Sequence, residues 1–214
     1  MGQEHISYIN KYGSLSLDFL CDPNSSSLEA ALAIAEGSPE TFLSENELYD
    51  RVNSIDLLVI ASPNFMHTPQ MLRWGQHKIT ILCEKPVAIN EKQVAALKAA
   101  QPSLNANIWV AFEYRFMPAV NKLVQLLPFI GQIKKVSIRE NRYPFLTKVE
   151  EWNKDVEKSG DTLIEKCCHF FDLFRLITSK EMKSCVSKGE MNLDLLFISC
   201  VLHLYSQTAF LLPL

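Results

Sequence analysis

The sequence predicts an α/β fold with a parallel sheet in its first half and an antiparallel sheet after it. Apolar runs alternate with amphipathic stretches, and the links between them are short, as in repeated β-α-β units. The runs at 55–61 and 80–83 are almost wholly apolar, which is typical of parallel strands covered on both faces. At 133–139 apolar and polar residues alternate instead, which indicates an antiparallel strand with one face in water.

The elements of the first half are set off by capping and breaking residues. Ser25 or Ser26 can cap one helix, whose end is marked by Gly37, and Asn90 can cap another. Gly75 marks the end of a helix between two apolar runs. We expect strands at 15–21, 55–61, 80–83 and 108–112, and helices at 25–35, 45–52, 67–74 and 91–100.

The pattern changes near residue 115, where we place a domain boundary. A helix is expected at 119–127, and Gly160 and Asp161 open another that runs to about Thr178. The stretch 191–214 is dominated by Leu, Phe, Ile and Val, so a membrane span is one interpretation of it. Its polar interruptions favour a buried helix or a segment unrelated to the rest of the fold. The expected regions are 1–115, 116–182 and an apolar tail at 183–214.

Composition and charge narrow the functional classes. Of the 214 residues, 48% are hydrophobic and 21% are charged, which is typical of a globular chain rather than a disordered one. The 21 basic and 24 acidic residues give a net charge of −3, so no nucleic-acid partner is expected. Six cysteines occur without a C-x-x-C pair, and the first residues lack the basic and apolar parts of a secretory leader. We therefore expect reduced thiols and a cytoplasmic location, and we do not expect a membrane partner.

Two segments suited to ligand binding follow apolar runs. SPNFMH, residues 62–67, comes after the run at 55–61, and its backbone N–H groups can approach a cofactor where the chain turns into a helix. CEKP, residues 83–86, ends the next run, and charged side chains at the carboxyl end of a parallel strand lie where α/β proteins bind ligands. Each segment also has a plainer interpretation, an ordinary strand-to-helix turn for the first and a surface salt pair for the second.

A third segment, 159–172, combines carboxylates with a histidine on one expected helix. Glu165 and His169 are four residues apart, and His169 and Asp172 are three apart, so the three side chains share a helix face. A carboxylate one turn away can orient an imidazole and tune its basicity for proton transfer. The alternative is a helix surface whose polar groups are satisfied locally.

Together and in this order, SPNFMH, CEKP and the glycine-led helix with E-x-x-x-H resemble the Gfo/Idh/MocA oxidoreductase family, named for glucose–fructose oxidoreductase, inositol dehydrogenase and a rhizopine catabolism protein. The stretches EYRFMPAV at 113–120 and RENRYPFLTKVEEWN at 139–153 are also similar to the family, and the resemblance covers roughly residues 1–180. It implies an amino-terminal Rossmann domain that binds NAD or NADP. It also implies a carboxyl-terminal α/β domain whose open antiparallel sheet holds the substrate and often an oligomer interface, so the full-length family is expected to form homo-oligomers.

The resemblance implies roles for single residues. Lys85 would contact the reacting hydroxyl, His169 would act as general acid and base, and Glu165, where the family commonly has aspartate, would assist His169. Oxidation of a sugar or polyol alcohol by a nicotinamide cofactor needs such a base. Further matches are Gly2, Asp22, Ser62, Pro63, Asn64, His67, Glu84 and Lys85 for the cofactor, and Tyr114, Arg115, Trp152 and Asp172 for the substrate pocket. No metal ligands are expected.

Asp22 bears on the choice of cofactor because it directly follows the expected strand at 15–21. An acidic side chain at this position can hydrogen-bond the ribose hydroxyls and disfavour a 2′-phosphate, so NAD is expected over NADP. The alternative is a turn aspartate in front of Pro23.

The family pattern begins with a strand and a G-x-G-x-x-G loop, whereas MGQEH, residues 1–5, is similar to the end of that loop and the start of the first helix. Gly2 would be the last glycine of the motif. The first strand, which lies in the middle of the order 3-2-1-4-5-6, is not matched. We therefore expect a Rossmann-like parallel sheet lacking its first strand, in a truncated member of the family: a fragment, a splice-derived product or a gene model with wrong ends.

Three functional interpretations follow. The first is an NAD(P)-dependent oxidoreductase that transfers hydride between nicotinamide and a hydroxyl or carbonyl of a sugar, polyol or related compound. The second is a truncated, non-catalytic scaffold or regulatory fragment, which the unmatched phosphate loop favours. The third is a membrane-tethered fragment that uses the tail.

Overall fold

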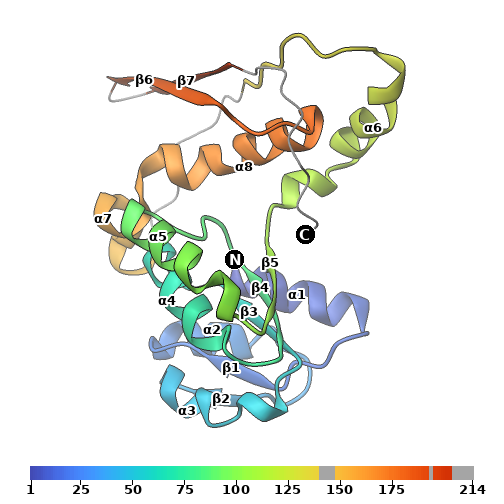
Figure 1. The fold of residues 1–214 in the computed structure, drawn as a ribbon. Helices are drawn as coiled ribbons and strands as arrows, with labels where there is room; N and C mark the ends of the chain where they lie inside the picture. The colour runs from blue at the N-terminus through green and yellow to red at the C-terminus, as the bar shows by residue number, and fades with distance from the viewer. Residues whose placement is uncertain (140–147, 193–194, 204–214) are drawn as a thin grey trace. The chain divides into compact units, whose positions relative to one another are not determined.

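The computed structural model describes residues 1–139, 148–192 and 195–203. Contacts divide the chain into two compact units, Met1–Ala111 and Phe112–Leu214, called here the amino-terminal and carboxyl-terminal units (Figure 1). Among the helices in the described ranges, none is both long and apolar enough to cross a membrane.

The amino-terminal unit alternates helices with short strands, as the sequence predicts. β4 has the predicted bounds, and β1 is shorter than predicted because only its last residues pair with another strand. Its elements are α1 (Gly2–Tyr12), β1 (Phe19–Cys21), α2 (Ser25–Leu32), β2 (Glu40–Phe42), α3 (Glu45–Tyr49), β3 (Leu57–Ile60), α4 (Asn64–Trp74), β4 (Thr80–Cys83), α5 (Glu91–Ala100) and β5 (Asn107–Val110).

The strands of this unit form two parallel sheets, which confirms the predicted parallel arrangement. β1 pairs with β2, with Phe19 opposite Glu40. The other sheet has the order β3-β4-β5, with Leu57 opposite Thr80 and Thr80 opposite Asn107. Within residues 1–139, β1 and β3 share no neighbouring strand, as expected of a Rossmann order whose central strand is not matched.

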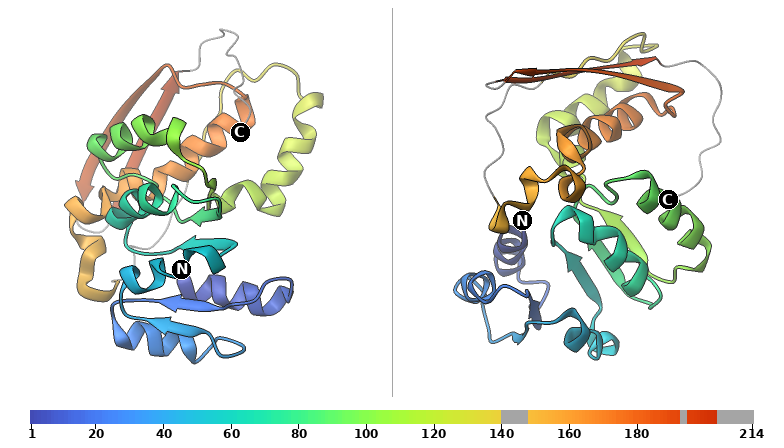
Figure 2. Two further views of the ribbon diagram at one scale, coloured as in Figure 1. Left: turned by 60° about the horizontal axis from the view of Figure 1, so that its bottom comes forward. Right: turned by 90° about the vertical axis from the view of Figure 1, so that its left-hand side faces the viewer.

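One apolar core joins the two sheets. Phe42 of β2, Ile60 of β3, Ile81 of β4 and Trp74 of α4 belong to the same buried cluster, and Phe19 of β1 packs against it. In the right-hand view of Figure 2, α1 and α2 lie on one side of the strands, and α4 and α5 lie on the other. Ile60 of β3 and Ile81 and Cys83 of β4 are buried, as the continuous apolar runs of these two strands predict, whereas Trp109 of β5 is 57% exposed.

Local details of this unit correct two predictions and add one strand. Asn24, rather than Ser25 or Ser26, caps α2, because its side chain accepts a hydrogen bond from the Ser27 N–H. α4 begins at Asn64, directly after Pro63, and so includes most of the SPNFMH segment. β2 was not predicted, since a strand of three residues, two of them polar, leaves no periodic signal. The predicted cap Asn90 is confirmed, because it accepts from the Gln93 N–H.

The described elements of the carboxyl-terminal unit are mostly helical before a final hairpin. α8 has the bounds that Gly160 and Asp161 predict, and β6 and β7 form an antiparallel pair with Ser184 opposite His203. The elements are η3 (Glu113–Phe116), α6 (Pro118–Leu126), η4 (Leu127–Phe129), η5 (Val149–Lys154), α7 (Val156–Ser159), α8 (Asp161–Thr178), β6 (Ser184–Asn192) and β7 (Leu195–His203).

The antiparallel strands are not the ones predicted. Residues 133–139 form neither a helix nor a strand, although their pattern alternates, because a strand also requires a neighbour that supplies backbone hydrogen bonds. The expectation of a helix in the tail is wrong for Leu195–His203, which is β7. Its β-branched residues fit a strand, and the preceding strand β6 pairs with it. The rest of the predicted tail, 193–194 and 204–214, lies outside the described residues.

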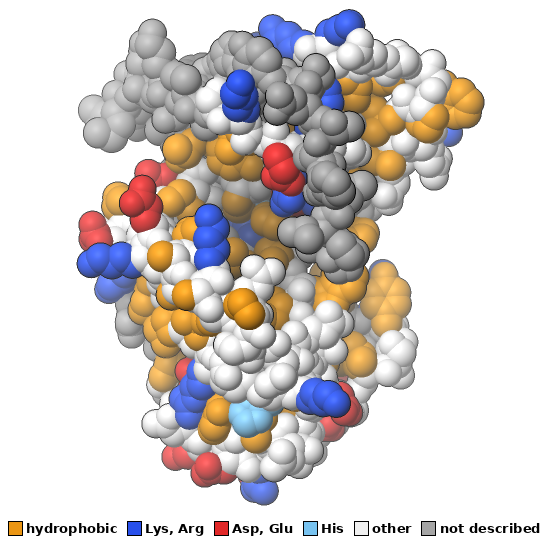
Figure 3. Space-filling view, viewed as in Figure 1, with side chains coloured by type: hydrophobic (Ala, Val, Ile, Leu, Met, Phe, Trp, Pro, Cys, Tyr) orange, Lys and Arg blue, Asp and Glu red, His pale blue; other side chains and the backbone are white. Residues whose placement is uncertain are grey.

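α6 and the turn after it carry apolar side chains at the surface. The most exposed is Phe129, at 83%, followed by Ile130, and Leu123 and Leu126 of α6 are also exposed. Figure 3 shows this apolar surface at its upper right. Val120 and Val124 of α6 are half-buried.

Candidate functional site

The carboxyl ends of β3 and β4 meet at one edge of the parallel sheet. The backbone ladder continues past the strands, because the Glu84 N–H donates to Ile60 O at 2.8 Å and the Ala111 N–H donates to Cys83 O at 2.8 Å. The segments 62–64 and 84–86 therefore leave the sheet side by side. This brings together two of the predicted motifs, SPNFMH and CEKP.

The first turn of α1 lies at the same edge. A Cβ added to Gly2 would lie 3.9 Å from Ala61 Cβ, and Ala61 directly follows β3. His5 Nε2 donates to Glu84 Oε1 at 2.7 Å, which ties α1 to the residue after β4. The α1 N-terminus, whose first backbone N–H groups have no partner inside the helix, is thus fixed where the two strands end.

His67 holds the two loops together from inside the unit. Its side chain is 1% exposed, with Nε2 at 2.8 Å from Ser62 O and Nδ1 at 2.8 Å from Pro86 O. Burial lowers the pKa of His67 below its ordinary value, so the ring is neutral and donates to one of the two carbonyl oxygens at a time. Both ring nitrogens are used by the backbone, so His67 supports the loops and does not present a ring nitrogen to a cofactor.

Glu84 is a buried carboxylate with an ion partner. Burial on its own would raise the pKa of Glu84, but the hydrogen bond and charge of His5, with the charge of Lys85, outweigh it and lower that pKa. Glu84 is therefore ionised at neutral pH. We call His5, Asn64, His67, Glu84 and Lys85 the edge cluster; Asn64 is 4% exposed and Lys85 is half-buried.

Asp22 is half-buried in a turn. Its Oδ1 accepts from the Asn24 N–H at 2.9 Å, which is the local geometry of the turn interpretation. The carboxylate nonetheless stands directly after β1, as a ribose-binding acid requires, so both interpretations of Asp22 fit its place.

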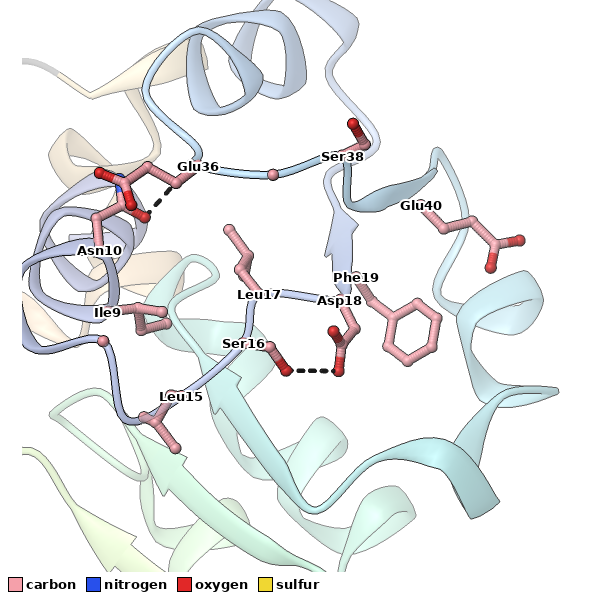
Figure 4. Close-up of a pocket in the computed structure, with 12 residues that line it drawn as sticks. Ile9, Asn10, Leu15, Ser16, Leu17, Asp18, Phe19, Glu36, Ser38 and Glu40 are labelled. Atoms are coloured by element: carbon pink, nitrogen blue, oxygen red, sulfur yellow. Dashed lines mark hydrogen bonds between the residues drawn. The ribbon is translucent and has the colours of Figure 1, made fainter.

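A cavity of about 480 Å³ lies at the opposite end of β1, between the end of α1 and the chain before β2 (Figure 4). Ser16 and Asp18 hydrogen-bond across part of its wall at 3.2 Å. The residues that line this cavity include none of the predicted cofactor residues. The predicted cofactor site is therefore the open edge at the carboxyl ends of the strands, and not this cavity.

In the carboxyl-terminal unit, α8 and η3 surround His169. The His169 ring is 2% exposed and stacks on Tyr114 with ring centroids 4.2 Å apart and planes 10° apart. Phe112 meets it edge-on, and Glu113 Oε1 lies 3.5 Å from Nε2. Lys166 donates a hydrogen bond to the Tyr114 hydroxyl. We call Phe112, Glu113, Tyr114, Lys166 and His169 the His169 cluster.

The remaining predicted residues lie on the same elements. Glu165 is buried on α8, one turn before His169. Arg115 and Asp172 form a bidentate pair with both N–O distances at 2.6 Å, and the hydrogen bond from Asp172 raises the pKa of Arg115. Arg115 and Asp172, both predicted for the substrate pocket, are therefore paired with each other in this structure. Trp152 is half-buried on η5, a separate element that packs against α7.

Sequence reasoning did not identify His5, Glu113 or Lys166. His5 lies in the segment MGQEH, and nothing in the sequence spacing links it to Glu84, 79 positions away. Glu113 directly precedes the predicted Tyr114 and Arg115, and Lys166 follows Glu165. Their adjacency to predicted residues was the only available signal.

Comparison with known proteins settles the family. The model described as "Oxidoreductase family, NAD-binding Rossmann fold" matches residues 1–112, which is more than half of the chain. The chain belongs to the Gfo/Idh/MocA oxidoreductase family. The family's "C-terminal alpha/beta domain" model matches residues 129–190, so the match reaches into the segment expected to be an unrelated tail.

Similar proteins share the fold over a part of their length. The Escherichia coli uncharacterized oxidoreductase YgjR is 34% identical over 56% of this chain and 37% of its own. The glucose-6-phosphate 3-dehydrogenase of Bacillus subtilis is 26% identical over 72% of this chain and 44% of its own, so the chain spans less than half of either relative. The WlbA dehydrogenase of Thermus thermophilus, solved with NAD and UDP-GlcNAcA, superposes with a TM-score of 0.63 at 24% identity and covers 87% of this chain and 62% of that one.

Proposed function

We propose that the protein is an NAD-dependent oxidoreductase that acts on a hydroxyl or carbonyl group of a sugar, polyol or related compound. The observation that carries this proposal is the joining of α1 to the ends of β3 and β4 through Gly2, Ala61, His5 and Glu84. It creates an edge where a helix N-terminus and two strand ends converge, which is where doubly wound folds bind dinucleotides.

The residues at this edge fit NAD. The α1 N-terminus is suited to the pyrophosphate, because its N–H groups and dipole favour an anion, and Gly2 brings no side chain between them. Pro63 and Asn64, at the start of α4, would line the cofactor from the next loop, and Ser62 supports that loop by donating to Gln70 Oε1. When bound, NAD supplies a hydride acceptor in its nicotinamide ring.

Asp22 supports NAD over NADP. Its carboxylate follows β1 and is anchored by the Asn24 N–H, so it cannot swing away from the loop freely. A 2′-phosphate would meet this negative charge, whereas ribose hydroxyls can donate to it. NADP binding is therefore expected to be weaker.

Two residues are proposed for the chemistry of the substrate hydroxyl. His169 would take and return the hydroxyl proton, with the stacked Tyr114 ring restricting its rotation and the Glu113 carboxylate 3.5 Å from its Nε2. The Lys85 ammonium would stabilise negative charge that develops on the substrate oxygen. Glu165 is buried one turn before His169, and it would supply the carboxylate that aspartate commonly supplies at this position in the family.

The substrate class follows from the relatives rather than from a pocket of this chain. The B. subtilis relative is named for oxidation of a sugar phosphate, and the T. thermophilus relative was solved with a nucleotide sugar. A hydroxyl-rich ring also suits the half-buried Arg115 guanidinium and Trp152 indole as pocket residues.

The test is turnover of the full chain with NAD and a panel of aldoses, sugar phosphates, nucleotide sugars and cyclic polyols, followed by the absorbance of reduced nicotinamide. Turnover with one of these classes, and its loss in His169→Ala, is the expected result. Wild-type turnover in His169→Ala would contradict the proposed proton transfer. A folded chain that binds no NAD would contradict the proposal as a whole.

A non-catalytic scaffold is the second candidate, and one observation favours it. β1 and β3 each pair with a single strand within the amino-terminal unit, so their facing edges lack the ladder that completes a Rossmann sheet. NAD binding without turnover of any substrate class would support this candidate.

A further inference from the structure

Lys166 is a buried lysine within the His169 cluster. It is 7% exposed, although a lysine on a helix ordinarily extends its ammonium group into water. Its Nζ lies 4.6 Å from the centroid of the Tyr114 ring and 5.9 Å from that of Phe170, and it donates a hydrogen bond to the Tyr114 hydroxyl. Burial of a charged group is costly, so packing alone does not account for a lysine at this place.

Tyr114 connects Lys166 to the imidazole of His169. Its hydroxyl accepts the hydrogen bond from Lys166, and its ring stacks on the His169 ring with centroids 4.2 Å apart and planes 10° apart. Lys166 and His169 are three residues apart on α8, so they lie on one face of the same helix. One helix therefore holds Tyr114 at two points, by its hydroxyl and by its ring.

The attachment at the hydroxyl matters because η3, which carries Tyr114, is short. η3 comprises only Glu113–Phe116, and a 3₁₀ turn has poorer hydrogen-bond geometry than an α-helix. Tyr114 is half-buried, so neighbouring side chains do not enclose its ring. Without the bond from Lys166, the Tyr114 ring would be free to turn, and His169 would lose the flat surface that fixes its plane.

We propose that Lys166 is a positioning residue that acts through Tyr114 and fixes the plane of the His169 ring for proton transfer. This inference rests on the proposed function, in which His169 takes and returns the proton of the substrate hydroxyl. A base acts efficiently only when its nitrogen is aligned with that proton, and a misplacement of about 1 Å can cost on the order of a hundredfold in rate. Lys166 itself needs no contact with the substrate or the cofactor.

The first test measures the stack itself and needs no turnover. Ring currents shift the imidazole protons of a histidine stacked on an aromatic ring upfield in the NMR spectrum of the full chain, which has five histidines. The His169 resonance is identified by its loss in His169→Gln, and Tyr114→Leu gives its position without the stacked ring. Lys166→Met keeps the side-chain length without the ammonium group, and it should move the resonance most of the way to the Tyr114→Leu position. Lys166→Arg keeps a donor and should retain most of the wild-type shift.

The second test is a double-mutant cycle in kcat with an identified substrate. Lys166→Met and Tyr114→Phe each remove one partner of the hydrogen bond, and each should lower kcat by between about tenfold and about a hundredfold with little change in the KM for NAD. Because both substitutions act on one contact, the double variant should lose no more than the more damaging single variant. Lys158→Met is the matched control, since Lys158 is an exposed lysine on α7 of the same unit and this variant should keep the wild-type kcat.

The outcomes separate this inference from the proposed function. An unchanged His169 resonance in Lys166→Met would overturn the inference, whether or not the chain turns over a substrate. Losses in kcat that multiply in the double variant would also overturn it, because Lys166 would then act independently of Tyr114. A resonance that responds as expected, in a folded chain without turnover, would support the positioning of His169 by Lys166 and contradict the proposed function alone.

Discussion

The edge cluster and the His169 cluster are built in different ways. In the edge cluster, the backbone hydrogen bonds of a parallel sheet set where each residue leaves its strand, and side chains such as His67 then bond to backbone carbonyls. In the His169 cluster, side chains of η3 and α8 bond and stack directly on one another. The edge is thus determined mainly by strand order and register, whereas the His169 cluster depends on how two helical segments pack.

This difference predicts where the protein tolerates change. Substitutions beneath the edge should act through the apolar core that supports the strands. Substitutions in the His169 cluster should act through single polar contacts, and their effects should stay local.

The largest expected effect is on the chemistry of the His169 cluster. His169→Ala should lower kcat by roughly 10²–10⁴-fold, which is the usual contribution of a general acid or base. Glu113→Gln should lower it less, because Glu113 is exposed and only adjusts the imidazole. Steady-state kinetics with an identified substrate checks both, with His77→Ala as the control. Equal losses in Glu113→Gln and His169→Ala would contradict the proposed division of roles.

The core beneath the edge should give the largest loss of stability. Ile81 of β4 is fully buried, so Ile81→Ala should lower the free energy of unfolding of the amino-terminal unit by about 2–5 kcal/mol. Hydrogen exchange resolved by peptide measures this in β3, β4 and β5 and, separately, in α8. Equal losses of protection in β4 and α8 would show instead that the two units unfold together.

A smaller and local loss is expected from the Arg115–Asp172 pair. Asp172→Asn removes the charge of a buried carboxylate that holds the guanidinium with two bonds. The expected cost is about 1–3 kcal/mol, towards the lower end because Arg115 is about a third exposed to water. Urea unfolding, monitored by the hydrogen-exchange protection of α8, measures this cost. A loss of protection in β4 as well would contradict a local effect.

The smallest effect is a pH dependence at the edge. The pKa of Glu84 is lower in the folded chain than its ordinary value of 4.5, so Glu84 binds protons more readily when unfolded. Its contribution to stability is present above pH 4.5 and is lost as the pH falls through the folded pKa. His5 and Lys85 are the neighbours that lower this pKa.

The pH effect is measured by urea unfolding of the wild type and Glu84→Gln over a series of pH values from neutral to below 4.5. The wild type should lose stability more steeply on acidification than the variant does. Parallel curves for the two proteins would rule out a stabilising role for the ionised carboxylate.

Much of the amino-terminal unit could be predicted because its signals are local. The continuous apolar run of β4, the cap Asn90 and the order of SPNFMH and CEKP each reside in a few adjacent residues. Strand order then brings the motifs together without further information. The contact of His5 with Glu84 could not be predicted, because it depends on where α1 packs on the sheet.

The carboxyl-terminal unit was less predictable because pairing there is not local. The alternation at 133–139 is that of a strand, yet the described antiparallel pair is β6 with β7. Spacing on α8 correctly placed Glu165, His169 and Asp172 within three turns of a single helix. The Glu113 carboxylate, whose Oε1 lies 3.5 Å from His169 Nε2, comes instead from η3, and no helix spacing relates it to His169.

The most direct test of the account is calorimetric titration of the folded full chain with NAD, with NADP alongside. The central claim is that α1 and the ends of β3 and β4 form a dinucleotide site with Asp22 facing the ribose. It predicts saturable binding of one NAD per chain and weaker binding of NADP, with the difference reduced in Asp22→Asn. A chain shown by circular dichroism to be folded, and that binds neither dinucleotide, would contradict it.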